Sequence, residues 1–148
     1  MSNIVNFPQQ GSLAVEVKPR KRNSHHARWY NQFKEGKLSS DDAIAKLARS
    51  VKKATDEGFE RGSLIMTPTI NAGLDMQELQ WDRLVCCYMF YSAKYWGDGD
   101  WLACDAALEN GDAILASYIL PEVDFVITTS PDRDITMFMT KADVEHHL

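Results

Sequence analysis

Carboxylates are the side chains in this sequence that are best placed to bind a metal ion or to take part in catalysis. Five lie in one short stretch, at Asp98, Asp100, Asp105, Glu109 and Asp112. Carboxylates at such spacing can hold a divalent cation, as a metal-dependent enzyme would require. A calcium loop needs oxygen ligands at alternate positions, whereas the apolar residues 101–103 occupy the middle of this stretch. Helix capping explains Asp98, Asp100 and Asp112 more simply, so we predict neither a metal site nor a cofactor.

The other residue types that support catalysis are poorly placed for it. All four histidines lie near the chain ends, at His25, His26, His146 and His147, which leaves the middle of the chain without an imidazole for acid–base work. Adjacent cysteines on a helix, such as Cys86 and Cys87, point their sulfur atoms about 100° apart, which suits packing better than metal binding. The sequence contains no Gly-x-Ser-x-Gly, P-loop, His-Glu-x-x-His or Cys-x-x-Cys motif. We therefore predict a non-enzymatic protein, with a carboxylate-based, metal-dependent enzyme as an alternative, and expect the three cysteines, including Cys104, to be reduced and buried.

Charge is unevenly distributed along the chain. The 148 residues contain 16 Lys and Arg against 21 Asp and Glu, for a formal net charge of −5. Residues 1–34 hold six basic residues and one acidic residue, whereas residues 98–148 hold eleven carboxylates and two basic residues. Because summed charge steers association between macromolecules, the two ends of the chain favour different partners.

The acidic C-terminal third predicts a protein partner with a basic surface. The chain would then be a module that binds another protein and modulates or inhibits it. The residues expected at this interface are Glu122, Asp124, Asp132, Asp134, Asp105 and Glu109. This hypothesis requires that the carboxylates share one face of the folded chain.

The basic N-terminal arm supports an alternative, a nucleic-acid-associated regulator. Its phosphate contacts would come from Lys18, Arg20, Lys21, Arg22 and Arg28. Trp29 and Tyr30 would be available to stack on bases. The helical spacing of Trp29 and Phe33 also fits positions in the core, which competes with that role.

The pattern of apolar residues predicts mostly helices. We expect an extended arm over 1–24, a short helix over 27–35, and an amphipathic helix from Ser39 and Ser40 to about residue 61. No regular element is expected over 64–73. Residues 76–96 are apolar on most sides, which predicts a central helix covered by the others. Two helices should follow, over 101–110 after a cap at Asp98 or Asp100 and over 113–120 after a cap at Asp112.

A change of period towards the C-terminus indicates strands. Residues 123–129 and 135–140 alternate or run apolar, and residues 130–134 between them have turn chemistry. The sequence thus predicts a mainly α (α+β) protein. It would be a compact bundle of four to five helices around the central helix, about 76–96, with a C-terminal β-hairpin over about 123–140. A flexible basic arm, 1–24, would precede this single domain, 25–148.

Chain length and hydropathy indicate where in the cell the protein is expected. No apolar run reaches the ~18 residues of a membrane span, and the first residues lack the features of a secretory signal. We therefore expect a cytoplasmic protein that does not contact membranes. A homodimer is also expected, because the central helix has more apolar surface than its short neighbours cover. With its small size and uneven charge, the chain is similar in style to accessory proteins of phages and other mobile elements.

Overall fold

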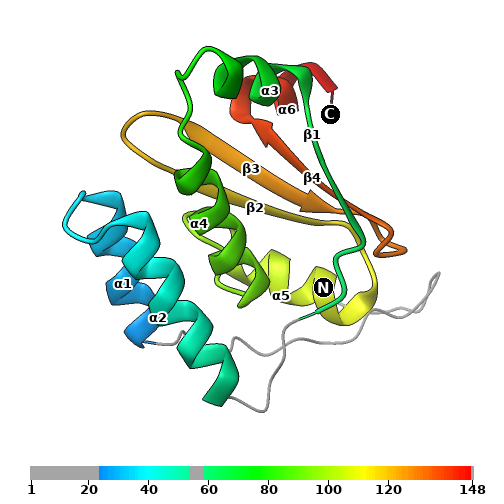
Figure 1. The fold of residues 1–148 in the computed structure, drawn as a ribbon. Helices are drawn as coiled ribbons and strands as arrows, with labels where there is room; N and C mark the ends of the chain where they lie inside the picture. The colour runs from blue at the N-terminus through cyan, green and yellow to red at the C-terminus, as the bar shows by residue number, and fades with distance from the viewer. Residues whose placement is uncertain (1–23, 54–58, 148) are drawn as a thin grey trace.

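The structure is a computed structural model that describes residues 24–53 and 59–147 (Figure 1). Within these residues there are six helices and one four-stranded sheet. The elements are α1 (Ser24–Lys34), α2 (Ser40–Lys53), β1 (Ser63–Met66), α3 (Pro68–Asp75), α4 (Trp81–Ser92), α5 (Trp101–Asn110), β2 (Ile114–Ile119), β3 (Asp124–Thr129), β4 (Ile135–Thr140) and α6 (Lys141–His147). The predicted arm lies outside the described residues, apart from Ser24.

The strands form one mixed sheet in the order β1-β4-β3-β2. β2 pairs antiparallel with β3, β3 pairs antiparallel with β4, and β1 runs parallel to β4. The predicted helical bundle with a C-terminal hairpin is therefore wrong. The hairpin exists as β3 and β4, but it forms the middle of a larger sheet, and the protein is of the α+β class.

The largest error concerns residues 113–120, which contain strand β2 instead of a helix. Ile114, Ala116 and Tyr118 are buried and alternate with the exposed Leu115 and Ile119, which is the period of a strand. A short apolar run does not by itself distinguish a strand from a buried helix. Here the hydrogen bonds offered by β3 decide the outcome, so Asp112 caps no helix.

Two elements lie where the sequence predicts no regular structure. Residues 63–66 are β1, which has no local partner and exists because β4 lies beside it. Thr67 then caps α3 by accepting the Ile70 N–H (3.4 Å), and Pro68 suits the first turn because its missing N–H is not needed there. The long helix predicted to reach residue 61 is also wrong, since Phe59 lies outside any helix.

The central helix is shorter than predicted but is central. α4 begins at Trp81 because residues 76–80 turn the chain at Gln77, whose φ is 61°. It crosses in front of the sheet, with α1 and α2 beside it (Figure 1). Its buried residues are Leu84, Cys86, Cys87, Phe90 and Tyr91. Neither α4 nor any other described helix is long and apolar enough to cross a lipid bilayer.

Local hydrogen bonds confirm three predicted helix boundaries. Ser39 accepts the Asp42 N–H (3.1 Å) at the start of α2, and Asp100 accepts the Ala103 N–H (3.0 Å) at the start of α5. α5 ends at Gly111, whose φ of 73° is left-handed and therefore favours glycine.

The two faces of the sheet differ. The face towards α4 and α5 carries the buried residues Tyr118, Phe125, Ile127, Thr129 and Phe138. The pairing register places Leu115, Ile119, Val126, Met137 and Ile135 on the opposite face, which we call the outer face. The short helix α6 packs against β3 and β4 and covers part of the outer face.

Candidate functional site

The six acidic residues predicted to form one interface lie in four separate places. Asp105 is inside the protein, with 7% of its surface exposed, and its carboxylate accepts the Trp96 indole N–H (2.8 Å). It satisfies a buried donor and does not face a partner. Glu122 and Asp124 lie at the β2–β3 turn, and Asp132 and Asp134 lie in the β3–β4 turn. Glu109 is exposed at the end of α5.

Glu122 is held by the protein itself. Arg83 of α4 donates two hydrogen bonds to its carboxylate (2.6 and 2.9 Å) and a third to the Phe33 carbonyl (3.1 Å). The Arg83 guanidinium also stacks over the Phe33 ring, 4.3 Å from its centroid. Burial acts to raise the pKa of Glu122, but the hydrogen bond from Arg83 outweighs it and the pKa is lowered. Glu122 therefore ties the β2–β3 turn to α4 and α1.

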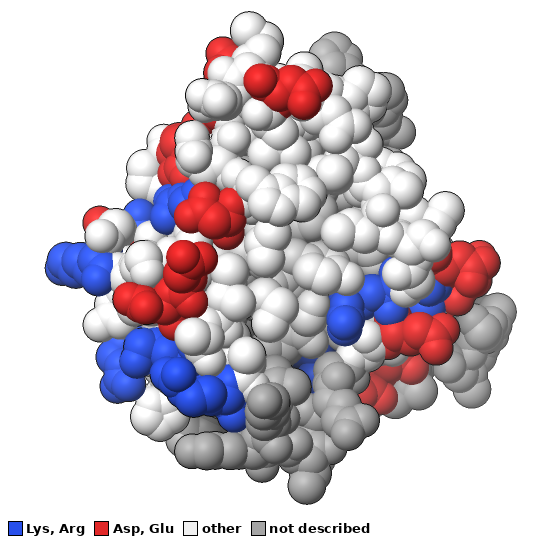
Figure 2. Space-filling view, viewed as in Figure 1, with Lys and Arg blue, Asp and Glu red and all other residues white. Residues whose placement is uncertain are grey.

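The remaining acidic residues lie at opposite ends of the sheet. β3 separates the two turns, and its six residues span about 17 Å. At the far end, hydrogen bonds from the Ser130 hydroxyl (2.6 Å) and the Asp134 N–H (3.0 Å) lower the pKa of Asp132. Arg133 joins this turn to the end of α5 by donating to the Ala107 carbonyl (3.1 Å). The predicted carboxylates thus form no single face, and acidic side chains are scattered over the view in Figure 2.

The carboxylates considered for a metal site hold structural elements together. Asp98 accepts hydrogen bonds from the Tyr30 hydroxyl (2.5 Å), the Lys34 ammonium (2.7 Å) and the Ile119 N–H (2.9 Å). Burial raises the pKa of Tyr30, and Asp98 raises it further, so Tyr30 stays protonated and donates. In the described ranges, no three His, Cys, Asp or Glu side chains converge as a metal site would require.

The cysteines are buried, as predicted. Cys86, Cys87 and Cys104 are free thiols with no more than 2% of their surface exposed. Burial raises the pKa of Cys86 and of Cys104 to about 12 and raises that of Cys87 as well. Because the thiolate is the reactive form, these side chains are inert packing groups at neutral pH.

The nucleic-acid hypothesis is only partly within the described residues. Four of its basic residues, Lys18, Arg20, Lys21 and Arg22, fall outside them. Arg28 is exposed on α1, but Tyr30, the second proposed stacking residue, is 1% exposed and lies in the core. Trp29 is half-buried, with the Lys46 ammonium 5.7 Å from its ring centroid. Tyr30 therefore has no free face for a base, and the arm itself stays a prediction.

An apolar groove on the outer face is a feature that sequence reasoning missed. It has a volume of about 280 Å³ and lies between β2, β3 and α6. Its walls include the exposed Leu115 and Ile119, 41% and 48% accessible, and Val144 of α6. Asp124, Lys141 and Glu145 also line it. The sequence signal that could have revealed the groove is the run of apolar residues over 114–119. In a strand, this run places apolar side chains on both faces of the sheet.

Helix α6 forms one wall of this groove and is anchored at its first turn. Thr140 and Asp143 form a capping box, with the Asp143 N–H donating to the Thr140 hydroxyl (3.2 Å) and the Thr140 N–H to the Asp143 carboxylate (3.1 Å). The Thr67 and Thr69 hydroxyls also donate to Asp143 (2.7 and 2.8 Å). Burial acts to raise the pKa of Asp143, but these hydrogen bonds outweigh it and the pKa is lowered. The sequence Thr140-Lys141-Ala142-Asp143 carried this signal.

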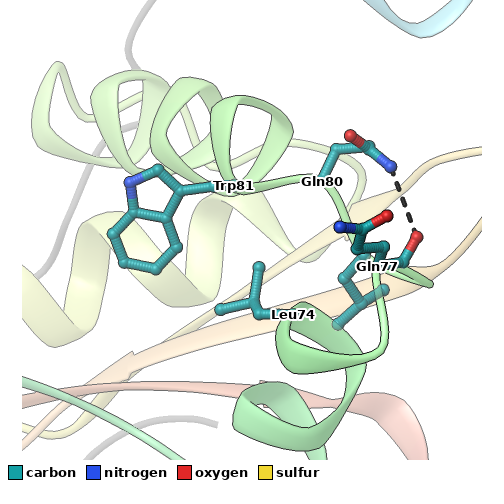
Figure 3. A pocket seen from close by; sticks show the side chains of 5 residues that line it. Leu74, Gln77, Gln80 and Trp81 are labelled. Atoms are coloured by element: carbon teal, nitrogen blue, oxygen red, sulfur yellow. Dashed lines mark hydrogen bonds between the residues drawn. The ribbon is translucent and has the colours of Figure 1, made fainter.

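A second hollow lies between α3 and α4 (Figure 3). It has a volume of about 420 Å³ and is lined by Leu74, Gln77, Leu79, Gln80 and Trp81. The Gln80 amide donates to the Gln77 carbonyl (3.4 Å) on one side, and Trp81 and Leu74 lie on the other (Figure 3). This hollow has no charged group in its lining, whereas the outer-face groove has three. The groove is therefore the better candidate for selective binding.

Comparison with known proteins identifies no relative. No protein-family model, curated protein or solved structure matches this chain.

Proposed function

We propose that this protein is a non-enzymatic accessory module that binds a segment of another protein in the outer-face groove. The observation that carries the proposal is the exposure of Leu115 and Ile119 on β2, a strand whose other face is buried. Apolar side chains on a rigid strand provide contact area at low entropic cost when a partner covers them. The three buried, reduced cysteines favour a cytoplasmic location for this binding.

The charges around the groove indicate the chemistry of the partner. Two carboxylates, Asp124 and Glu145, line the groove together with one cation, Lys141. Within the described residues, neither carboxylate forms an ion pair. The groove therefore suits an apolar segment that carries at least one basic residue. Of the six acidic residues predicted to form the interface, only Asp124 lines the groove. The exposed Asp132 and Asp134 in the β3–β4 turn contribute only long-range attraction to a basic partner.

The test is affinity capture from nuclease-treated host lysate at low and moderate salt, with quantitation of each captured protein. We expect a partner that is retained by the wild type and lost with Leu115→Arg or Asp124→Lys. Leu102→Arg is the matched control, because Leu102 is similarly exposed (50%) but lies on α5. A partner that binds the groove variants as well as the wild type would contradict the proposal. Capture of nucleic acid that requires residues 1–24 would support the arm hypothesis instead.

A further inference from the structure

Strand β1 is an open edge of the sheet. It is the last strand on its side, and within the described residues only β4 pairs with it. The Ser63 N–H donates to the Asp134 carbonyl (2.8 Å) and the Thr67 N–H to the Phe138 carbonyl (3.1 Å). Because successive residues of a strand direct these groups to alternate sides, the backbone N–H and C=O of Leu64 and Met66 point away from β4.

Within its four residues, this edge carries no charge, proline or bulge, and its shortness is its only protection. Natural proteins protect such edges with charged residues, proline or bulges, whereas β1 reads Ser-Leu-Ile-Met. Leu64 and Ile65 are 42% and 41% exposed. Figure 2 shows an uncharged surface over β1 and the adjoining side of α4. The edge therefore presents hydrogen-bonding groups between apolar side chains.

The residues that bracket β1 restrict how another strand can pair with it. Gly62 has a φ of 66°, and a Cβ there would lie 2.1 Å from the Asp134 carbonyl oxygen, so the extended conformation begins after it. Pro68 lacks an N–H and begins α3. Only Leu64 and Met66 can then contribute to a new ladder. An antiparallel strand can pair with the backbone N–H and C=O of both Leu64 and Met66. It does so when two of its residues whose N–H and C=O point towards β1 lie opposite Leu64 and Met66.

We propose that β1 pairs antiparallel with β1 of a second copy of this chain, which joins two four-stranded sheets into one. In the two-fold register, Leu64 lies opposite Met66 of the second copy and four backbone hydrogen bonds form. Ile65 then lies opposite Ile65 of the second copy, as a non-hydrogen-bonded pair. The four residues of β1 are uncharged, so no like charges meet in this register. This self-complementarity identifies a second copy as the occupant.

The proposed interface differs from the one expected from the sequence. The sequence predicts a homodimer that forms through the apolar surface of the central helix. In the structure, α4 is covered by α1, α2 and the sheet. A ladder of four residues buries less than the roughly 800 Å² per partner of a standard interface. The dimer should therefore be weak and depend on protein concentration.

Disulfide trapping with Ile65→Cys tests the register directly. Opposed Cα atoms in a non-hydrogen-bonded pair are about 4.5 Å apart, within the range for a disulfide. Leu64→Cys is the matched control. In the proposed register, Leu64 lies diagonally across from Leu64 of the second copy, at about 7–8 Å, which is beyond the range for a disulfide. We expect the Ile65→Cys full-length chain to form a covalent dimer at least ~10-fold faster than Leu64→Cys or Ile119→Cys under mild oxidation. Equal rates, or faster trapping with Leu64→Cys, would overturn the proposal.

Sedimentation equilibrium over a wide concentration range tests the dimer without cross-linking. The wild type should show a concentration-dependent dimer that Ile65→Lys and Leu64→Pro abolish, the latter by removing an outward N–H that edge strands tolerate losing. Circular dichroism checks that both variants stay folded. Ile119→Lys alters the outer-face groove and should leave the dimer intact, so this result is independent of the proposed function. A wild type that stays monomeric, or a dimer that survives Ile65→Lys, would show that β1 does not pair with itself.

Discussion

At one edge of the sheet, β2 is held by the loop before α5, whereas at the other edge β1 pairs with β4 on one side and has no described strand on its outer side. The Asp98 N–H donates to the Ser117 carbonyl of β2 (2.7 Å), and the Asp98 carboxylate accepts the Ile119 N–H (2.9 Å). The same carboxylate reaches Tyr30 and Lys34 of α1. Leu64 and Met66 of β1 have no equivalent of Asp98 among the described residues.

The difference shows two ways in which one sheet treats its unpaired backbone groups. At the closed edge, a single carboxylate satisfies a backbone donor and also joins the edge to a helix, so the edge contributes to stability. At the open edge, no residue of the described ranges satisfies the same groups in the monomer, which leaves them available to another strand. The closed edge should therefore respond to mutation through folding, and the open edge through association.

Removal of Asp98 should have the largest effect. We expect Asp98→Ala to lower the free energy of unfolding by about 3 kcal/mol, because the Tyr30 hydroxyl and the Ile119 N–H lose their acceptor. Urea denaturation at pH 7 measures this loss. Asp100→Ala, which removes one helix cap in the same loop, should cost about 1 kcal/mol. Equal losses in the two variants would show that Asp98 does not hold the closed edge.

Asp143 anchors the chain just beyond β1 and should have the next largest effect. We expect Asp143→Asn to cost about 1.5 kcal/mol at pH 7, since hydrogen bonds to a charged acceptor become neutral ones. The folded pKa of Asp143 is lowered, so its contribution is present above the unfolded pKa of about 4 and is lost as pH falls through the folded value. Urea midpoints measured from neutral to acidic pH should therefore converge for wild type and variant. A gap independent of pH would contradict this assignment, and Asp75→Asn, exposed at the end of α3, provides the control.

The pair between Arg83 and Glu122 should contribute less, because Glu122 is partly exposed. We expect Glu122→Gln to lower the free energy of unfolding by about 0.5–1 kcal/mol. A double-mutant cycle with Arg83→Met isolates the coupling between the two side chains. A coupling near zero would return Glu122 to the set of residues available to a partner.

The open edge should give the smallest effect on folding. Ile65→Thr in dilute, monomeric protein should change the free energy of unfolding by less than about 0.5 kcal/mol, as is usual for exposed positions. The same substitution should weaken the dimer in sedimentation experiments. A loss of stability comparable to that of Asp98→Ala would show that the two edges do not differ in the way described.

Residues with short-range hydrogen bonds could be predicted from the sequence. Ser39 and Asp100 each accept a hydrogen bond from the backbone N–H three residues later and so cap their helices. Gly111 ends α5, and the turn at 130–134 joins β3 to β4. Each of these features depends on contacts within a few residues, so local sequence contains the needed information. The burial of the three cysteines was also predictable, since their side chains have little alternative to packing.

The candidate site could not be predicted in the same way, because its parts are distant in the chain. The predicted acidic residues share composition but not location: Asp105 turns inward to Trp96, and Glu122 is bound by Arg83, 39 residues away. The outer-face groove needs β2, β3 and α6 together, and only the sheet register places Leu115 and Asp124 on the same face.

The sequence by itself determined where α2 begins, where α5 begins and ends, which thiols are buried and where the chain reverses between β3 and β4. Tertiary structure alone decided that residues 114–119 are a strand, that β1 exists and that one edge of the sheet is closed while the other is open. The physical reason is that a helix satisfies its backbone within its own segment, whereas a strand requires a partner that can lie anywhere in the chain.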